Sequence, residues 1–212
     1  MYQKYIKSPL DKILAFFILI ITLPITGFIA ILIKMESGSP ILFIQDRTGK
    51  DGINFKMLKF RSMTHGNDVR DSAKENQMTK MGKIVRKLSI DELPQLINIL
   101  RGEMSFIGPR PWIPEYYKCM SEEQRQRNSV LPGITGLAQA RGRNDLTIHE
   151  KIAFDLGYAR RISAREDLKI IFLTAVTVLK KSGQEISKLG IHQELDVLAS
   201  DSINANRYSE RG

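Results

Sequence analysis

Cysteine is nearly absent from this sequence: Cys119 is the only one among 212 residues. A single cysteine excludes an internal disulfide framework and a zinc site built from cysteine ligands. It is typical of a protein that works in a reducing compartment. A chain of this length is expected to form one domain with an attached segment, and it can bury a sizeable core.

Several motifs of nucleotide- and metal-dependent enzymes are also missing. The sequence has no Walker or dinucleotide-binding glycine fingerprint and no internal repeat. It has no Asp-x-Asp motif, which argues against a soluble metal-dependent glycosyltransferase and against haloacid-dehalogenase-like phosphotransfer. Acidic residues are in the minority, with Lys+Arg 32 against Asp+Glu 23, a net charge of +9 and a pI near 9.7. This balance favours anionic partners, such as phosphorylated ligands, anionic lipid or nucleic acid.

Charge is absent altogether from residues 13–33, an apolar run that follows the basic segment at residues 1–12. As a helix this run would measure about 31 Å, close to the thickness of a bilayer core, so we predict a membrane segment. Pro24 lies at its centre and is expected to kink or break the helix. The run is then either a kinked spanning helix or a re-entrant helix that returns on the same face. Lysines on both flanks favour a cytoplasmic position for each flank.

Two β-prone runs follow, at residues 41–44 and 53–60, and the glycine-containing turn between them predicts a β-hairpin. Lys59 lies in the second run, where it can project towards a phosphate, although a solvated lysine is the commoner fate on a strand. Residues 63–78 are polar and without pattern, which predicts a loop.

The pair Asp91 and Glu92 belongs to the most informative stretch, which reads SIDELPQLINILRGEMSFIGPRP. Apolar residues recur behind the pair at i, i+3, i+4 and i+7, which predicts an α-helix with one buried stripe. Two starts are open: Ser89 can cap the helix with Glu92 in a capping box, or Pro94 can begin it with both acids just ahead. Either start favours the ionised carboxylates, as an anionic nucleophile requires.

Cations surround this acid pair. Arg86 and Lys87 lie near the end of a short basic helix predicted at residues 80–88, and Arg110 lies in a rigid segment between two prolines. An acid pair by itself is most often a plain helix start. With cations on both sides, it suggests an anionic substrate that is held beside a carboxylate.

The charged residues 114–128 are predicted to form a surface helix. Behind them, the glycines of LPGITGLAQARGRND surround Arg141 and Arg143. These glycines predict either a plain turn or a loop whose backbone can approach an anion.

Two capping boxes predict helices at residues 147–161 and 163–181. The second helix is strongly apolar between basic ends, so it is either a core helix or a helix at the membrane surface. Beyond about residue 190 the chain is polar and aperiodic, and we expect a variable or partly disordered tail.

Three segments resemble the small monotopic phosphoglycosyl transferases, bacterial sugar transferases that start lipid-linked glycan assembly: FKMLKFRSM, SIDELPQLINILRGEMSFIGPRP and PGITGLAQARGRN. They occur in that order behind the hydrophobic segment, and the resemblance covers residues 1 to about 183. It implies a mainly helical α+β fold, with an N-terminal re-entrant membrane helix, a small β-hairpin and surrounding amphipathic and interfacial helices. The expected parts are a membrane-embedded segment at residues 1–36, a cytoplasmic catalytic domain at 37–183 and a variable tail at 184–212.

The same resemblance implies an activity. Members of this family transfer a sugar 1-phosphate from a UDP-sugar to undecaprenyl phosphate or a similar polyprenyl phosphate and release UMP, with Mg²⁺. They work on the cytoplasmic face of the bacterial inner membrane and initiate glycoconjugate biosynthesis. Nothing in the sequence names the sugar.

Residue by residue, the resemblance implies a catalytic pair of Asp91 and Glu92, with Asp91 as the nucleophile that forms a covalent aspartyl-phosphosugar intermediate. Both carboxylates are candidate ligands of Mg²⁺. Phosphate or substrate binding falls to four basic residues: Lys59, Arg86, Arg110 and Arg143. One departure concerns the membrane break, where the family often has Ser-Pro and this chain has Leu23-Pro24. Thr22 is a nearby hydroxyl that could satisfy a carbonyl freed by the proline.

The expected partners are the UDP-sugar, undecaprenyl phosphate and membrane lipid, with no nucleic acid, and a homodimer is left open. The rival interpretation is a non-catalytic, membrane-anchored protein that binds polyanions through its basic surface. Such a protein would bind any polyanion with strong salt dependence and would not need the acid pair. Assays of UMP release from UDP-sugars separate the two interpretations.

Overall fold

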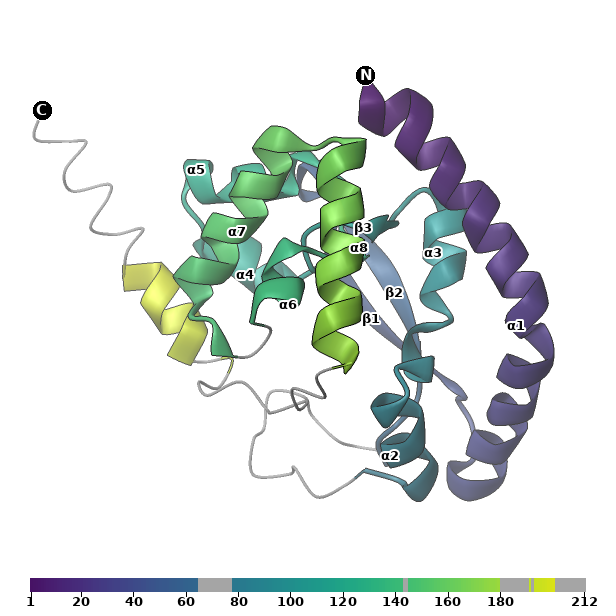
Figure 1. Cartoon of the computed structure of the whole chain (residues 1–212). Helices are drawn as coiled ribbons and strands as arrows, with labels where there is room; N and C mark the ends of the chain where they lie inside the picture. Colours follow the sequence, from purple (N-terminus) through teal and green to yellow (C-terminus); the bar gives the residue numbers. More distant parts are fainter. Residues whose placement is uncertain (65–77, 143–144, 180–190, 192, 201–212) are drawn as a thin grey trace, which may run out of the picture.

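The fold is known from a computed structural model that describes residues 1–64, 78–142, 145–179, 191 and 193–200. It is mainly helical, with two small two-stranded sheets, so the expected α+β class is confirmed. A long N-terminal helix arches along one side of a body that is built from the shorter helices and the strands (Figure 1).

This N-terminal helix begins with a π-helical turn at Gln3–Lys7 and continues as α1 (Ser8–Ser37). Among the described residues it is the one helix long and apolar enough to cross a membrane, judged by length and composition. It runs on through Pro24. The Thr22 hydroxyl donates to the carbonyl of Ile18 at 2.7 Å. The idea that this hydroxyl replaces the hydrogen bond lost at the proline is therefore wrong, because Pro24 frees the carbonyl four residues before itself, that of Ile20.

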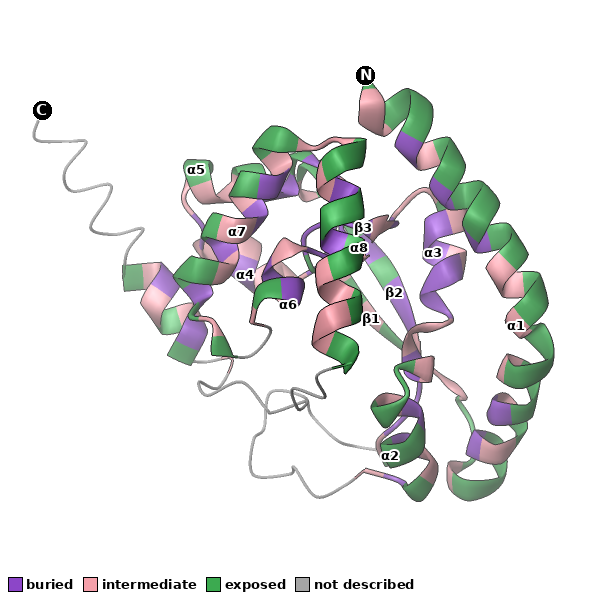
Figure 2. Cartoon of the chain, viewed as in Figure 1, coloured by how far each residue is buried: buried purple, intermediate pink, exposed green. Residues whose placement is uncertain are grey.

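The body buries α1 only near the two ends of the helix. Lys7, Asp11 and Ala15 are buried at one end, Ile29 and Ile33 at the other, at the spacing of one helical face. Between them the outer side of α1 is exposed (Figure 2), and its large apolar side chains there are Phe16, Phe17, Ile20, Ile21, Leu23, Ile25 and Phe28. Such a long exposed apolar surface fits a lipid environment.

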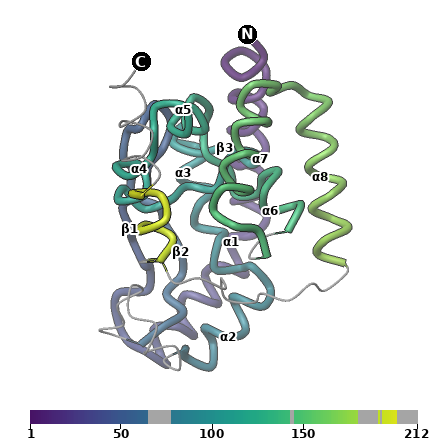
Figure 3. Tube along the Cα trace, turned by 90° about the vertical axis from the view of Figure 1, so that its left-hand side faces the viewer, coloured from purple at the N-terminus to yellow at the C-terminus, as the bar shows by residue number. Residues whose placement is uncertain are grey.

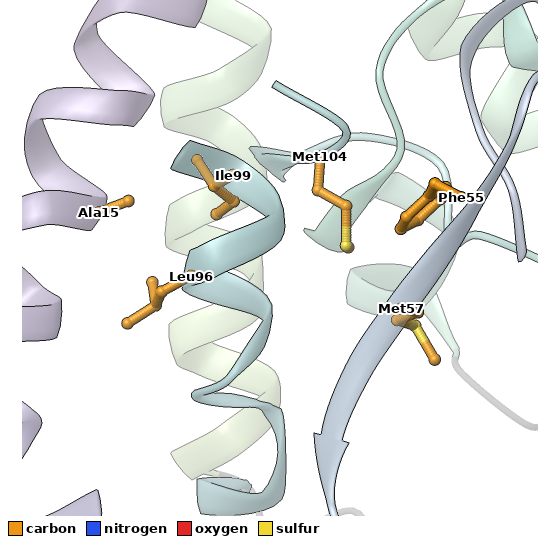
Figure 4. Packing of buried hydrophobic residues seen from close by; sticks show 6 residues of the cluster. All are labelled: Ala15, Phe55, Met57, Leu96, Ile99 and Met104. Atoms are coloured by element: carbon orange, nitrogen blue, oxygen red, sulfur yellow. The ribbon is translucent and has the colours of Figure 1, made fainter. Parts of the chain in front are cut away.

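The predicted hairpin is confirmed as the antiparallel strands β1 (Leu42–Thr48) and β2 (Asn54–Phe60). A 3-10 turn at Lys50–Gly52 joins them. The next elements are α2 (Lys80–Lys87), which confirms the short basic helix, and α3 (Gln95–Arg101). Helix α3 lies between α1 and β2, and the core there (Figure 4) consists of Ala15, Phe55, Met57, Leu96, Ile99 and Met104.

The glycine-rich segment serves a purpose different from the one expected. Strand β4 (Gly133–Thr135) pairs in parallel with β3 (Ser105–Ile107). A Cβ atom on Gly133 would clash with the backbone nitrogen of Gly108, and one on Gly136 would clash with the Gly108 carbonyl. These glycines therefore allow two pieces of backbone to pack together, which accounts for Gly133 and Gly136 without a bound anion.

The expected surface helix at residues 114–128 is broken into α4 (Pro114–Cys119), α5 (Glu122–Arg125) and a 3-10 turn at Gln126–Ser129. Its end is not on the surface, because Arg127 is only 1% exposed. The charged composition predicted a surface position, but Arg127 forms a buried ion pair with Asp155, which lies in the helix at Ile148–Arg161.

Three further helices follow: α6 (Leu137–Arg141), α7 (Ile148–Arg161) and α8 (Ala164–Leu179). The capping box at the start of α7 is confirmed. Helix α8 is divided between the two expected environments. Ile170 is fully buried and Leu173 packs against the same core cluster, while five of its large apolar side chains are exposed, namely Leu168, Ile171, Phe172, Val178 and Leu179. An exposed apolar face of this kind is typical of a helix at a membrane surface.

Within the segment expected to be a variable or partly disordered tail, residues 193–200 form a helix that lies beside α4 (Figure 3). Leu198 is fully buried there. Glu194 accepts hydrogen bonds from the Tyr116 hydroxyl at 2.6 Å and from Lys151 Nζ at 2.9 Å. The polar sequence of this segment gave no sign of the helix, because the residues that stabilise it lie far away along the chain.

Replacing a glycine by alanine should change the stability of the protein in opposite directions at Gly133, in the parallel strand pair, and at Gly157, in α7. Gly133→Ala should lower the free energy of unfolding by about 3 kcal/mol, because the new methyl group meets backbone that cannot move aside. Gly157→Ala is the matched control: this glycine lies in α7, and apart from its own stretch of helix no heavy atom lies within 4 Å of the added Cβ. It should stabilise the protein by about 0.5–1 kcal/mol. Thermal unfolding in detergent measures both, and a Gly133→Ala protein as stable as the wild type would contradict the packing argument.

Candidate active site

The acid pair lies on a short 3-10 turn, Ile90–Glu92, in front of α3. Ser89 adopts a left-handed conformation with φ 55°, and its side chain makes no capping hydrogen bond. The capping-box start is therefore wrong. The second start is confirmed to within one residue: both acids lie ahead of α3, and Pro94 is its N-cap, one position before the first helical residue, Gln95. Proline fits this place because an N–H there would lack an intrahelical partner.

Glu92 is paired with two cations from separate segments. Its Oε1 lies 2.9 Å from Lys59 Nζ on β2 and 3.6 Å from Arg110 Nη2, which follows β3. Burial alone would raise the pKa of Glu92, but Arg110 and Lys59 outweigh it and hold that pKa below the ordinary value. Burial and the nearby Arg110 lower the pKa of Lys59, against the opposing effect of Glu92. Glu92 is thus an ionised carboxylate whose charge is already neutralised.

Asp91 lies in a different environment from its neighbour. Its side chain is buried, with 8% of the residue exposed, and no ion pair to it is found among the described residues. Burial raises the pKa of Asp91, Lys59 opposes that rise, and the adjacent Glu92 adds to it. The expectation that the helix start favours ionisation of both acids is therefore wrong for Asp91. When ionised, this poorly solvated carboxylate is the more reactive of the two.

Asn98 on α3 fixes the distance between the acid turn and the strand that carries Lys59. Its Oδ1 accepts from the Leu58 N–H at 3.1 Å and its Nδ2 donates to the Lys56 carbonyl at 2.8 Å. The side chain thereby pairs with β2 as a neighbouring strand would. The apolar stripe did not reveal this residue, because α3 is buried on two sides, against α1 and against β2. The one clue in the sequence to the structural role of Asn98 was its position as a polar residue inside a short apolar helix.

The remaining predicted site residues have different outcomes. Arg86 lies in the last turn of α2, near enough to Asp91 for its charge to oppose the rise in the pKa of that carboxyl. Arg143 and most of the predicted loop, residues 65–77, lie outside the described residues. The structure thus brings together Asp91 and Glu92 with three of the four predicted cations.

The chemistry of these donors can accommodate Mg²⁺. Among the described residues there is no cluster of three or more His, Cys, Asp or Glu side chains that could hold a metal ion by themselves. Mg²⁺ does not require one, because it commonly takes one or two carboxylates and completes its shell with phosphate oxygens and water. Asp91 is the better candidate ligand, since Glu92 is committed to Lys59 and Arg110.

The two pKa shifts predict opposite stability changes for the two acids. Because the pKa of folded Asp91 is raised, its ionised form costs stability at neutral pH, and Asp91→Asn should unfold at a higher temperature than the wild type there. This advantage should disappear once the pH is below the ordinary aspartate pKa of about 3.9, where the wild-type side chain is protonated in both states. Unfolding curves at pH 7 and pH 3.5 check this, and a less stable Asp91→Asn protein at pH 7 would contradict it.

Glu92→Gln should behave in the opposite way. The lowered pKa means that the ion pairs of Glu92 stabilise the folded state at neutral pH, so this variant should lose about 1 to 3 kcal/mol there. The loss should shrink as the pH falls through the pKa of folded Glu92. A loss that is equal at pH 7 and pH 3.5 would show that the ion pairs are not its cause.

Comparison with known proteins identifies the family of this chain. The sequence model of the family described as bacterial sugar transferase matches residues 2–181. A Bacillus subtilis protein described as an uncharacterized sugar transferase, EpsL, is 41% identical over 180 residues, which cover 84% of this chain and 89% of that protein. Proteins of Caulobacter vibrioides and Escherichia coli described as UDP-glucose:undecaprenyl-phosphate glucose-1-phosphate transferases are 39% and 40% identical. The alignments cover 82% and 81% of this chain, but 69% and 40% of those two proteins. By matches that extend over most of its length, this chain belongs to the bacterial sugar transferase family.

Proposed function

We propose that this protein transfers a sugar 1-phosphate from a UDP-sugar to undecaprenyl phosphate and releases UMP. The observation that carries the proposal is the contrast between the two acids: Asp91 is buried and forms no ion pair with any described residue, while Glu92 beside it is neutralised by Lys59 and Arg110. The printed names of the relatives support these substrate classes. They also make UDP-glucose the first donor to test.

In the first step, a carboxylate oxygen of Asp91 attacks the β-phosphorus of the UDP-sugar. A bond forms between that oxygen and phosphorus, the bond from phosphorus to the bridging oxygen breaks, and UMP leaves with the electron pair. The sugar phosphate is then carried on Asp91 as an acyl phosphate. Lys59, Arg86 and Arg110 supply the fixed positive charge that such a transfer needs on the phosphate oxygens.

In the second step, a phosphate oxygen of the polyprenyl phosphate attacks the same phosphorus. The Asp91 carboxylate is released unchanged, and the product is a polyprenyl diphosphate sugar. Two successive displacements through one covalent intermediate predict ping-pong kinetics. Glu92 keeps Lys59 and Arg110 in place, and Mg²⁺ bound at Asp91 would neutralise phosphate charge.

The attachment of α1 supports a position on one side of a membrane. Both ends of the helix contact the same body, at Asp11 and Ile33, while the middle exposes apolar side chains. A helix that crossed the bilayer could not leave both ends against one water-exposed domain. We therefore propose a re-entrant helix, with the catalytic domain on the cytoplasmic face of the bacterial inner membrane. There the acceptor phosphate lies at headgroup level, within reach of Asp91.

Asp91→Asn should abolish UMP release from UDP-glucose in the presence of undecaprenyl phosphate, by several orders of magnitude, because an amide cannot act as the nucleophile. Asp46→Asn is the matched control, since Asp46 forms only an exposed pair with Lys56 on the hairpin. With donor alone, the wild type should release about one UMP per chain and gain the mass of a sugar phosphate on the tryptic fragment 88–101. Normal turnover in Asp91→Asn would exclude the covalent mechanism, and a basic polyanion binder would release no UMP in any variant.

The re-entrant helix can be tested with single cysteines, because Cys119→Ser removes the one native thiol. Lys4→Cys and Lys34→Cys place a thiol near each end of the N-terminal helix at exposed positions. A membrane-impermeant maleimide should label both in inside-out vesicles and neither in spheroplasts. Asp46→Cys in the catalytic domain serves as the control for the cytoplasmic side. Labelling of the two ends from opposite sides would show a spanning helix.

A further inference from the structure

The backbone around Arg110 has more acceptors than donors. Pro109 and Pro111 have no N–H, so this segment cannot form a regular ladder, and its carbonyl oxygens need donors from elsewhere. Three successive carbonyls receive one donor each, at 2.8, 3.2 and 2.8 Å: Arg110 from Arg127 Nη2, Pro111 from Arg47 Nη1 and Trp112 from the Thr48 N–H. The path of the segment is therefore set by groups from other parts of the chain.

Arg127 is the fully buried cation of this set. Its Nε and Nη2 both donate to Asp155 Oδ2 on α7, at 3.0 and 2.6 Å, and the same Nη2 donates to the Arg110 carbonyl. Its guanidinium carbon lies 3.9 Å from the ring centroid of Trp112. The Arg127 and Asp155 side chains are 1% and 2% exposed. The guanidinium is thus held by an acid, a carbonyl and an aromatic ring together.

Arg110 itself has little such support for its side chain. That side chain is 48% exposed, and its Nη2 reaches Glu92 Oε1 at 3.6 Å. A long, half-exposed arginine keeps much of its rotamer freedom, so the position of its own backbone largely determines where its charge can be placed. Whatever fixes the Arg110 carbonyl also limits where this charge lies.

We infer that Arg127, held by Asp155, is a positioning residue that aims Arg110 at Glu92 and at the substrate phosphate. The part that concerns the phosphate rests on the proposed function. Stability alone is a weak account of the pair, because desolvation offsets much of the attraction in a buried ion pair. The pair is also incompletely satisfied, because no group among the described residues donates a hydrogen bond to the buried Asp155 Oδ1, which lowers its value for stability.

The test replaces both partners, as Arg127→Met with Asp155→Leu, so that no unpaired charge is left buried. The double variant should fold, and its kcat for UMP release from UDP-glucose should fall about 10- to 100-fold, as expected for a misplaced catalytic group. In an Arg110→Ala background the same replacement should change kcat less than about 2-fold, because the group it positions is already absent. Equal losses in both backgrounds, or an unchanged kcat in the folded double variant, would overturn the inference. If the double variant does not fold, Arg127→Lys keeps the charge pair but loses the guanidinium geometry, and the same comparison applies.

Trp112 gives a second readout that does not depend on activity, because it is the only tryptophan in the chain. Loss of the Arg127 guanidinium should change its fluorescence emission and near-ultraviolet circular dichroism. The control is Arg160→Ala with Glu123→Ala, an exposed pair that joins the same two regions of the chain without touching the segment around Arg110. This control should leave both the emission and kcat unchanged. If the wild type consumes no UDP-sugar at all, the proposed function is wrong. The Trp112 signal then decides by itself whether Arg127 holds the segment around Arg110. An unchanged signal in the double variant would overturn the inference.

Discussion

The ion pairs of Glu92 are the interaction on which the site depends. Lys59 on β2 and Arg110 in the segment that follows β3 meet at one carboxylate oxygen and neutralise Glu92. Asp91 is left buried, with no ion pair to any residue that the structure describes. Two chemically similar neighbours thereby acquire different roles. Burying a carboxylate in this way costs stability, and perturbed groups of this kind are concentrated at functional sites. The surrounding structure holds the cations in place, through Asn98 for the strand of Lys59 and through Arg127 for the segment of Arg110.

The N-terminal helix is attached to this body by polar contacts at both ends. Near its start, Lys7 pairs with Asp167 of α8 at 2.9 Å, and Asp11 accepts from the Ser105 hydroxyl at 2.6 Å. Near its end, Glu36 accepts from the first two backbone N–H groups of α2, at 2.7 and 2.9 Å. These contacts connect the helix with β3 and α2, the elements that lead to Arg110 and Arg86. The contacts that hold α1 therefore also touch the elements that carry or precede two of the cations of the site.

Much of the fold could be predicted because its elements depend on local chemistry. The hairpin, the capping box of α7 and the start of α8 follow from turn residues, caps and periodicity within a few positions. The acid pair and its cations could be named for the same reason, since they lie in short, distinctive segments. Arg127 was assigned to the surface because its neighbours are charged, and only its pairing with Asp155, 28 positions away, explains its burial. The helix at residues 193–200 was missed because it is stabilised by α4 and α7.

The sequence by itself therefore determined which groups are present and which local structures carry them: the apolar helix, the hairpin, the acid pair and the proline-flanked arginine. Only the tertiary structure decided how the two acids differ, which helix start is used and what the glycines of β4 are for. The physical reason is that capping, turns and periodicity act between residues a few positions apart. Desolvation and ion pairing depend on what packs against a side chain, and those neighbours come from anywhere in the chain.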